Sequence, residues 1–200
     1  KPKKRPNLNP WKKITKIVLK TKKFVNIAII GKYVNLKDAY KSLDEALVHG
    51  GIANNVKVNL VRIESDNLKN NEIKSKLKNV SGLLIPGGFG KRGTEGKISA
   101  IRFARENKLP FLGICFGMQM AIVEFARNKL KINKAGSTEL DKKCYPVIGL
   151  INEWDKDGKI IKGTDKDLGG TMRLGLYEAK LRNNSAINRI YKLKVIKERH

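Results

Sequence analysis

The chain has 200 residues, 40% of them hydrophobic, which suffices for one domain with a buried core. Its 43 basic residues outnumber 18 acidic ones, and the resulting net charge of +25 suggests an anionic partner such as nucleic acid. No apolar stretch approaches the roughly 20 residues of a membrane span, and the run at 27–30 is too short for a signal peptide. We therefore expect a cytoplasmic protein without a membrane contact.

The charge alone does not establish nucleic-acid binding. Most of the basic residues are Lys, and Asn and Ile are also abundant, which is the bias that an AT-rich genome produces. No aromatic residues alternate with Arg in the manner of single-strand binders, so nucleic acid is not the expected main partner. Two cysteines, Cys115 and Cys144, do not make a disulfide framework, and a reducing compartment is expected.

The first 37 residues contain no acidic residue, and residues 1–23 also contain three prolines. We interpret residues 1–23 as a basic linker from a preceding domain, and 24–200 as the folded domain. The apolar, β-branched run at 24–31 predicts a buried strand. Residues 38–51 have the apolar spacing of a helix, which we expect to stop at Gly50 and Gly51.

Strands and helices then alternate along the chain. Strands are expected at 56–63, 82–86 and 110–114, and helices at 67–77, 96–107 and 116–130. Four successive strand–helix units predict an α/β fold with a mostly parallel sheet and helices on both faces. Beyond about residue 131, short apolar pieces flank a polar stretch at 152–170, and we expect antiparallel additions near the C-terminus.

One short segment carries the strongest chemical signal. Gly113, Cys115 and Gly117 lie where a predicted strand passes to a predicted helix, as in a nucleophile elbow. The glycines allow the sharp turn, and the dipole of the helix N-terminus lowers the pKa of a thiol placed there. The pattern predicts Cys115 to be a nucleophile, although a buried structural cysteine is the common alternative.

A nucleophile for acyl transfer also needs hydrogen-bond donors for the oxyanion. The N–H of Phe116 is one candidate, and the glycine-rich loop 86–90 at the same sheet edge offers a second. That loop opens a formal G-x-G-x-x-G at 88–93, but Cys115 stands where a dinucleotide site needs an acid. A phosphate loop is excluded because Thr94, not Lys, follows Gly93.

The general base is not evident. The chain has two histidines, His49 and His200. His49 is placed at the expected end of a helix, where histidine commonly contacts the last carbonyls, and His200 is the last residue of the sequence, where we expect the chain to fray. Neither is a convincing partner for a cysteine nucleophile.

Several motifs together resemble one family, the glutaminase domains of CTP synthases, which are class I glutamine amidotransferases. The resemblance runs from about residue 24 to the end and is carried by "GKYVNLKDAYKSLDEALVHGG", "PGGFGKRGTEGK", "GICFGMQ", "AGSTEL" and "DLGGTMRLG". The elbow is common to all such amidotransferases, whereas "GKYV…DAY" and "DLGGTMRLG" are narrower.

The resemblance implies an activity. Family members hydrolyse L-glutamine through a cysteine thioester and pass ammonia to a preceding synthase domain, which uses MgATP to aminate UTP to CTP. It implies no cofactor and no metal in this domain, MgATP, UTP and GTP for the full enzyme, and a homo-oligomer.

The resemblance also implies roles for particular residues. Cys115 matches the nucleophile, and Gly88 matches a main-chain contact to glutamine and the oxyanion. Glutamine binding is implied for Phe116, Gly117, Met118, Gln119 and Glu139. Arg92 and Glu95 match a lid connected with stimulation by GTP, although a solvated charged loop is the alternative.

The family's catalytic His and Glu, and an Arg for the substrate carboxylate, lie downstream of a segment similar to "KERH" at 197–200. We therefore expect the domain to be incomplete at its C-terminal end, and these 200 residues alone to be weak or inactive. Two alternatives remain: a non-catalytic basic binding or assembly domain of the same fold, and another hydrolase with a cysteine elbow. The narrow match of "DLGGTMRLG" opposes the latter.

Overall fold

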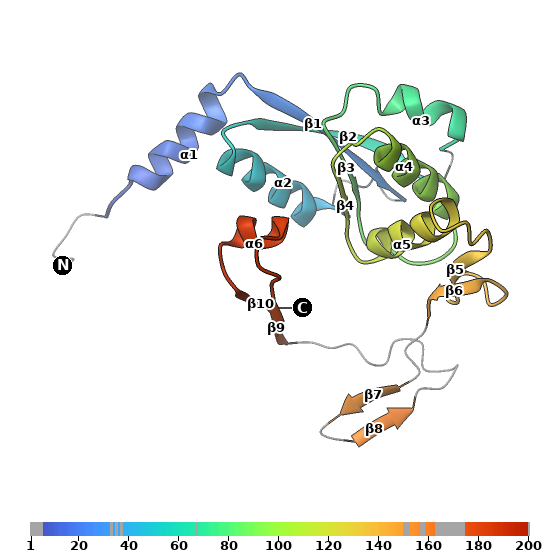
Figure 1. Cartoon of the computed structure of the whole chain (residues 1–200). Coiled ribbons are helices and arrows are strands. Elements are labelled where there is room, and N and C mark those ends of the chain that lie inside the picture. Colours follow the sequence, from blue (N-terminus) through green and yellow to red (C-terminus); the bar gives the residue numbers. More distant parts are fainter. Residues whose placement is uncertain are drawn as a thin grey trace. The chain divides into compact units, whose positions relative to one another are not determined.

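The structure, a computed structural model, describes residues 6–32, 34, 36, 38–66, 68–149, 153–156, 159–162 and 175–199. The chain divides after Gly149 into two units. The first contains a four-stranded, fully parallel sheet in the order β2-β1-β3-β4 (Figure 1). Its strands are β1 (Phe24–Gly31), β2 (Lys57–Glu64), β3 (Gly82–Ile85) and β4 (Phe111–Gly113). The predicted α/β class is confirmed.

Helices alternate with these strands and cover both faces of the sheet. They are α2 (Lys41–Ala53), α3 (Asn70–Lys76), α4 (Thr94–Glu106) and α5 (Phe116–Asn128). On one face α3, α4 and α5 enclose the main core, which includes Ala28, Ile30, Ile63, Leu83, Ile85, Ile101 and Met120. Because successive side chains of a strand point to opposite faces, Val58 and Arg62 face α2 instead.

The expected end of α2 at Gly50 and Gly51 is wrong, because the helix continues to Ala53. A Cβ on Gly51 would lie 2.7 Å from a methyl of Val58 and 2.8 Å from the carbonyl oxygen of Val56. Gly51 therefore allows the helix to pass close to β2 and does not terminate it. The other predicted helices and strands of the sheet lie within a few residues of their observed bounds.

After α5, β5 (Ala135–Ser137) pairs with β6 (Tyr145–Ile148). The pairing is parallel, so the expectation of an antiparallel addition fails for this segment. The turn between the strands brings the chain back to the start of β5, where Tyr145 N–H donates to Lys134 O at 2.8 Å. The strand therefore restarts beside β5 in the same direction.

The second unit contains antiparallel pairs, as expected. β7 (Glu153–Lys156) pairs with β8 (Lys159–Lys162), within the stretch predicted only as polar. β9 (Leu176–Lys180) pairs with β10 (Val195–Arg199), and α6 (Ala186–Tyr191) lies between them in the chain. His200 and all but the last residue of "DLGGTMRLG" lie outside the described residues.

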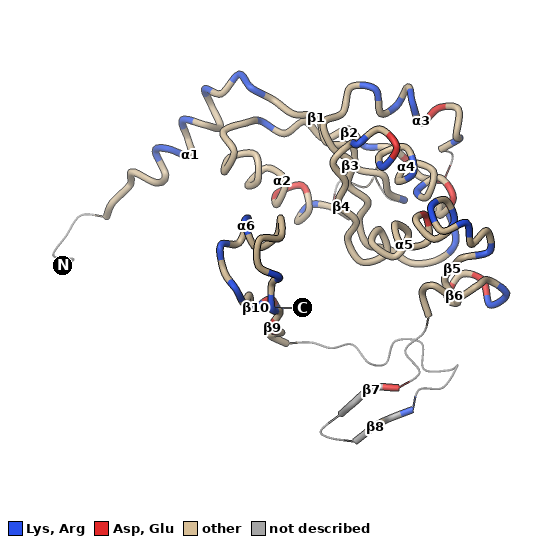
Figure 2. The backbone as a smooth tube through the Cα atoms, viewed as in Figure 1, with Lys and Arg blue, Asp and Glu red and all other residues tan. Residues whose placement is uncertain are grey.

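The basic N-terminal stretch contains a helix that the sequence interpretation did not include, α1 (Asn9–Lys20). Pro10 lies in its first turn, where a missing N–H costs nothing, and none of its residues is buried. Lys and Arg occur along α1 and most other elements, with acidic residues interspersed on α2, α3 and α4 (Figure 2). No helix within the described residues is both long and apolar enough to cross a membrane.

Candidate active site

The predicted elbow is present between β4 and α5. Cys115 precedes the first residue of α5 with φ 51° and ψ −106°, a backbone conformation that is rare for a residue with a side chain. Strain of this kind persists only where the surrounding structure enforces it, and it is common at functional sites. The thiol of Cys115 is exposed and is not in a disulfide. Its placement suits a nucleophile at a helix N-terminus.

The two glycines of the elbow are required by close packing. A Cβ on Gly113 would lie 2.6 Å from backbone atoms of Gly117 and Met118. A Cβ on Gly117 would collide with the carbonyl oxygen of Ile85 at the end of β3. The first turn of α5 therefore passes directly over the strand edge, which is possible only with glycine at both positions.

The glycine-rich loop after β3 lies beside the cysteine. A Cβ built on Gly87 would be 3.5 Å from Cβ of Cys115, so the loop backbone faces the elbow. Gly88, the residue assigned from the resemblance, is its neighbour and has open space where a side chain would be. Among the described residues, none accepts a hydrogen bond from the N–H of Gly88 or of Phe116. Both N–H groups are therefore available to bind an oxyanion.

The sequence interpretation missed the residue that anchors this loop. Lys32 follows β1, and its Nζ donates hydrogen bonds to the carbonyl oxygens of Phe89 at 2.5 Å and Gly90 at 3.0 Å. The ammonium thus ties the carbonyl groups of Phe89 and Gly90 to the end of β1. The only signal in the sequence is the Lys of "GKYV", which periodicity does not distinguish from the many other lysines.

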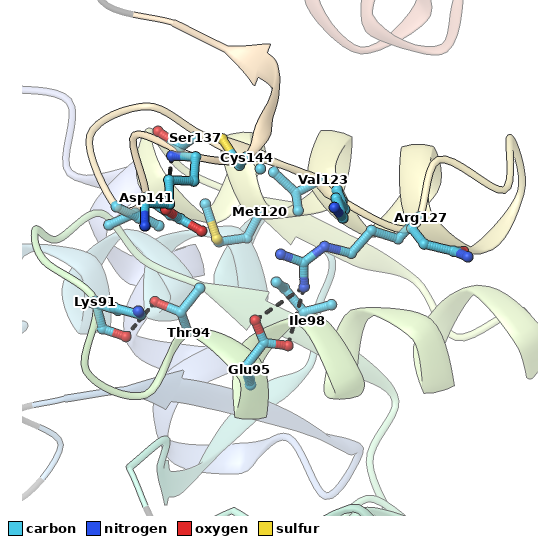
Figure 3. Close-up of a pocket in the computed structure, with 15 residues that line it drawn as sticks. Lys91, Thr94, Glu95, Ile98, Met120, Val123, Arg127, Ser137, Asp141 and Cys144 are labelled. Carbon is cyan, nitrogen blue, oxygen red and sulfur yellow. Dashed lines mark hydrogen bonds and ion pairs between the residues drawn. The ribbon is translucent and has the colours of Figure 1, made fainter.

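Two cavities lie near these elements. One, of about 380 Å³, is lined by Tyr40, Leu43, Pro86, Gly87 and Ile114 among others, and so adjoins both the loop and the elbow. The other, of about 560 Å³, lies between α4, α5 and the segment 133–144 (Figure 3). Its lining includes Met120, Arg127 and Cys144 but not Cys115. Cys115 is not in the lining of the smaller cavity either, but Gly87 and Ile114, which lie next to this cysteine in space and in sequence, respectively, are.

Arg92 and Glu95, the expected lid residues, are both tied to the body of the domain. Arg92 pairs with Asp66 at 2.6 Å. Glu95 lies in the first turn of α4 and accepts hydrogen bonds from Nη1 of Arg127 at 3.0 and 3.2 Å (Figure 3). The side chains of Arg92 and Glu95 are therefore both paired with residues outside the segment 88–95.

The remaining predicted residues are spread along α5 and the turn after β5. Phe116 is buried, Met118 is exposed, and Gln119 lies between these extremes. Glu139 is exposed in the turn that follows β5, and within the described residues no hydrogen bond or ion pair joins it to Cys115. His49 is exposed within α2, and within the described part of the chain no hydrogen bond joins it to Cys115. The structure thus describes no histidine at the elbow.

A buried lysine lies on the core side of the elbow. Lys97 of α4 is 2% exposed, and its Nζ is 5.0 Å from the centroid of the Phe116 ring. Burial, reinforced by the nearby charge of Lys32, lowers the pKa of Lys97 to about 8, while Asp66 and Glu64 oppose the shift. Within the described residues, no group of three or more His, Cys, Asp and Glu side chains is placed to hold a metal ion.

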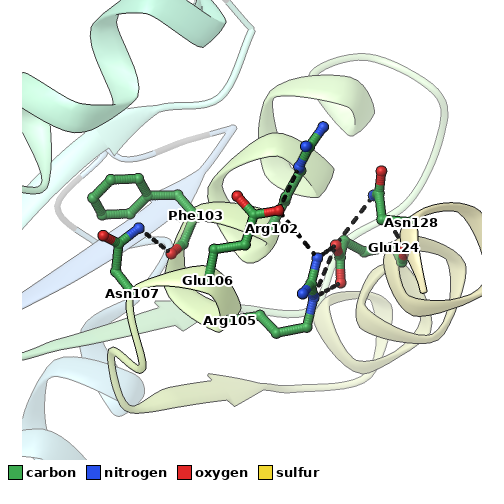
Figure 4. Close-up of polar contacts among 7 residues, drawn as sticks. All are labelled: Arg102, Phe103, Arg105, Glu106, Asn107, Glu124 and Asn128. Carbon is green, nitrogen blue, oxygen red and sulfur yellow. Dashed lines mark hydrogen bonds and ion pairs between the residues drawn. The ribbon is translucent and has the colours of Figure 1, made fainter.

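An ion pair fixes α5, which carries the elbow, to α4. Arg105 donates to both carboxylate oxygens of Glu124, with distances from 2.8 to 3.2 Å, and Glu124 is 1% exposed (Figure 4). The hydrogen bonds to Glu124 raise the pKa of Arg105 above its ordinary value. Asn128 donates to the same carboxylate at 3.1 Å. The buried charge is therefore fully partnered.

Comparison with known proteins decides the family. Residues 35–200 match the family model "Glutamine amidotransferase class-I". This chain belongs to the class I glutamine amidotransferase family. The resemblance read from its motifs is thereby confirmed.

Two of the similar sequences are both named CTP synthase. The chain is 76% identical over its whole length to a CTP synthase of Pelagibacter ubique (strain HTCC1062) and 53% identical over 98% of its length to one of Rhizobium johnstonii. It spans 37% and 36% of these relatives, respectively. It also resembles the solved glutaminase domain of Trypanosoma brucei CTPS with bound acivicin, with a TM-score of 0.73 and 31% identity. That match covers 88% of this chain and 66% of the solved one.

Proposed function

We propose that this chain is the glutaminase part of a CTP synthase and that Cys115 is its nucleophile. The observation that carries the proposal is the elbow itself: an exposed thiol in a strained turn, at a helix N-terminus, beside the backbone of Gly87. The solved relative with bound acivicin supports a glutamine-like ligand for this family of domains.

The chemistry follows from the groups at the elbow. The thiolate of Cys115 attacks the side-chain amide carbon of L-glutamine, and the N–H groups of Gly88 and Phe116 bind the oxyanion that forms. Collapse of this intermediate breaks the C–N bond, releases ammonia and leaves a γ-glutamyl thioester. Water then hydrolyses the thioester to glutamate and restores the thiol. The proton transfers require a general base, for which the described residues offer no histidine at the elbow.

The remaining assignments extend this proposal. Gly117, Met118, Gln119 and Glu139 contribute to glutamine binding, and Arg92 and Glu95 belong to a segment that responds to GTP. Ammonia passes to a synthase domain that uses MgATP and UTP, within a homo-oligomeric enzyme of the cytoplasm. Residues 1–23 form the link to that domain, and residues 24–200 belong to the amidotransferase domain.

The test is glutamine hydrolysis by the native full-length protein. We expect Cys115→Ser to lower kcat at least about 10³-fold, because a hydroxyl cannot replace the thiolate under the same base. Cys144→Ser is the matched control and should retain activity, since Cys144 lies in the turn between β5 and β6 and lines a cavity that Cys115 does not. Full glutamine hydrolysis by Cys115→Ser would reject the proposal.

A non-catalytic basic domain is the alternative that the net charge raises. It predicts tight, salt-sensitive binding to an anionic partner that is unchanged in Cys115→Ser. The elbow geometry favours the enzyme, because an exposed thiol in a strained turn at a helix N-terminus is the arrangement that a cysteine nucleophile needs.

A further inference from the structure

Lys97 occupies a position that the proposed chemistry does not use. Its side chain leaves α4 and ends in the core, with the ammonium over the face of Phe116. Phe116 is itself 2% exposed and is the residue directly after Cys115. A cation over an aromatic face is attracted by the ring quadrupole, and more strongly where water is excluded. The contact therefore joins α4 to the first residue of α5.

The charged groups around Lys97 come from the ends of two strands. Lys32 follows β1, Glu64 is the last residue of β2, and Asp66 lies two residues after it. The first turn of α5 contributes no acidic residue, and Asp66 is also paired with Arg92. The two carboxylates only partly compensate for burial and for the repulsion from Lys32. Lys97 is therefore mostly charged at pH 7 and mostly neutral above pH 9.

A buried ammonium costs stability, and an apolar side chain of the same length would pack there without that cost. Its contact with Phe116, the residue directly after Cys115, offers a chemical reason for the charge. The thiolate of Cys115 and the oxyanion that forms from it are both negative, and both lie at the end of α5 that Phe116 begins. A fixed positive charge on the core side stabilises each of them.

We propose that Lys97 is a positioning residue for the nucleophile elbow, which holds Phe116 through its ring and places a positive charge behind Cys115. The proposal rests on the proposed role of Cys115 as the nucleophile. Lys97 touches neither substrate nor thiol in this account and acts through Phe116.

The test measures the rate of alkylation of Cys115 by iodoacetamide between pH 6.5 and 10, in the native full-length protein with Cys144→Ser as background. We expect Lys97→Met to react about three- to tenfold more slowly than the background protein at pH 7, because the thiolate loses a favourable charge. The two rates should converge above pH 9, where Lys97 has itself lost its proton. Lys129→Met, which removes an exposed lysine at the far end of α5, is the matched control and should not change the rate.

Lys97→Arg provides the second comparison, because arginine keeps its charge at every pH. Lys97→Arg should be alkylated at Cys115 as fast as the background protein at pH 7. If Lys97→Met is not properly folded, as shown by a loss of cooperative unfolding, the rate of Lys97→Arg decides whether the charge is needed. Equal rates for Lys97→Met and the background protein at pH 7, a rate ratio that is the same at all pH values, or a Lys97→Arg as slow as Lys97→Met would each overturn the proposal. Absence of alkylation at Cys115 in the background protein would instead contradict the proposed function.

Discussion

Gly117 shows at the scale of one residue how packing creates the site. Helix α5, which follows Cys115, crosses the end of β3 so closely that the carbonyl oxygen of Ile85 occupies the space of a side chain on Gly117. Cys115, two residues before Gly117, has a positive φ of 51° at the same turn. The packing of the elbow therefore requires glycine at positions 113 and 117.

Gly117→Ala should consequently be costly. We expect it to lower the free energy of unfolding by about 2 kcal/mol or more, since α5 must move away from β3, and to lower glutamine hydrolysis with it. Gly50→Ala is the control, because a Cβ at this position in α2 would meet no atom within 4 Å. This substitution should stabilise the helix by about 0.5–1 kcal/mol. Urea unfolding of both variants measures the difference. A Gly117→Ala variant of unchanged stability would show that α5 does not lie against β3 as described.

Lys97 makes a separate prediction about stability and pH. Its pKa of about 8 in the folded protein lies below the ordinary 10.5 of an exposed lysine. Between these values the unfolded chain binds more protons, so the contribution of Lys97 to stability rises with pH and is least favourable below pH 8. Lys97→Met should therefore raise the free energy of unfolding by about 1–3 kcal/mol at pH 7, and by progressively less toward pH 10.5. Urea titrations at several pH values test this, and a less stable Lys97→Met at pH 7 would contradict the burial cost.

At the scale of elements, the pairing of α4 with α5 determines where the elbow lies. Glu124 is buried on α5 and is satisfied by Arg105 of α4, so the two helices are joined by a charge that neither could bury alone (Figure 4).

Arg105→Met should therefore destabilise the protein by about 3 kcal/mol, because it leaves the carboxylate of Glu124 buried without its partner. The double variant Arg105→Met, Glu124→Met should recover most of that loss. Arg102→Met is the control, since its pair with Glu106 is exposed and contributes at most about 1 kcal/mol. Thermal unfolding compares the three, and equal effects of the two single Arg variants would show that the Arg105 pair is not a buried interaction.

The elements of the sheet were predictable because their signals are local. Buried parallel strands are short apolar runs, and the helices between them show the spacing of one apolar face, so four strand–helix units follow from periodicity. The end of α2 was not predictable, because Gly51 is a packing residue whose reason is Val58 on the next strand. The parallel pairing of β5 with β6 likewise depends on a turn whose hydrogen bonds have no sequence signature.

In the candidate site, too, residues with a local sequence signal were predictable, and residues whose roles depend on distant contacts were not. Cys115, its flanking glycines and the loop 86–90 were found because each breaks a local pattern at the same edge of the sheet. Lys32 and Lys97 were not, because their roles depend on contacts with Phe89 and Phe116 that are distant in sequence. In a chain with 43 basic residues, a single functional lysine cannot be recognised by type.

At the scale of the whole molecule, the chain corresponds to about a third of the CTP synthases that it resembles. The unit up to Gly149 holds the elbow, the loop 86–90 and the buried lysine, and the antiparallel pairs belong to the unit that follows. The groups to which we assign the nucleophile and the oxyanion donors thus lie within one parallel sheet and its helices.

The most direct measurement is peptide mapping of the native full-length protein after incubation with acivicin, used as an electrophilic glutamine analogue. We predict one adduct per chain, located on Cys115, absent from Cys115→Ser and prevented by excess L-glutamine. An adduct on Cys144, or no adduct on a folded protein with an exposed Cys115, would contradict the assignment of the elbow cysteine as the nucleophile.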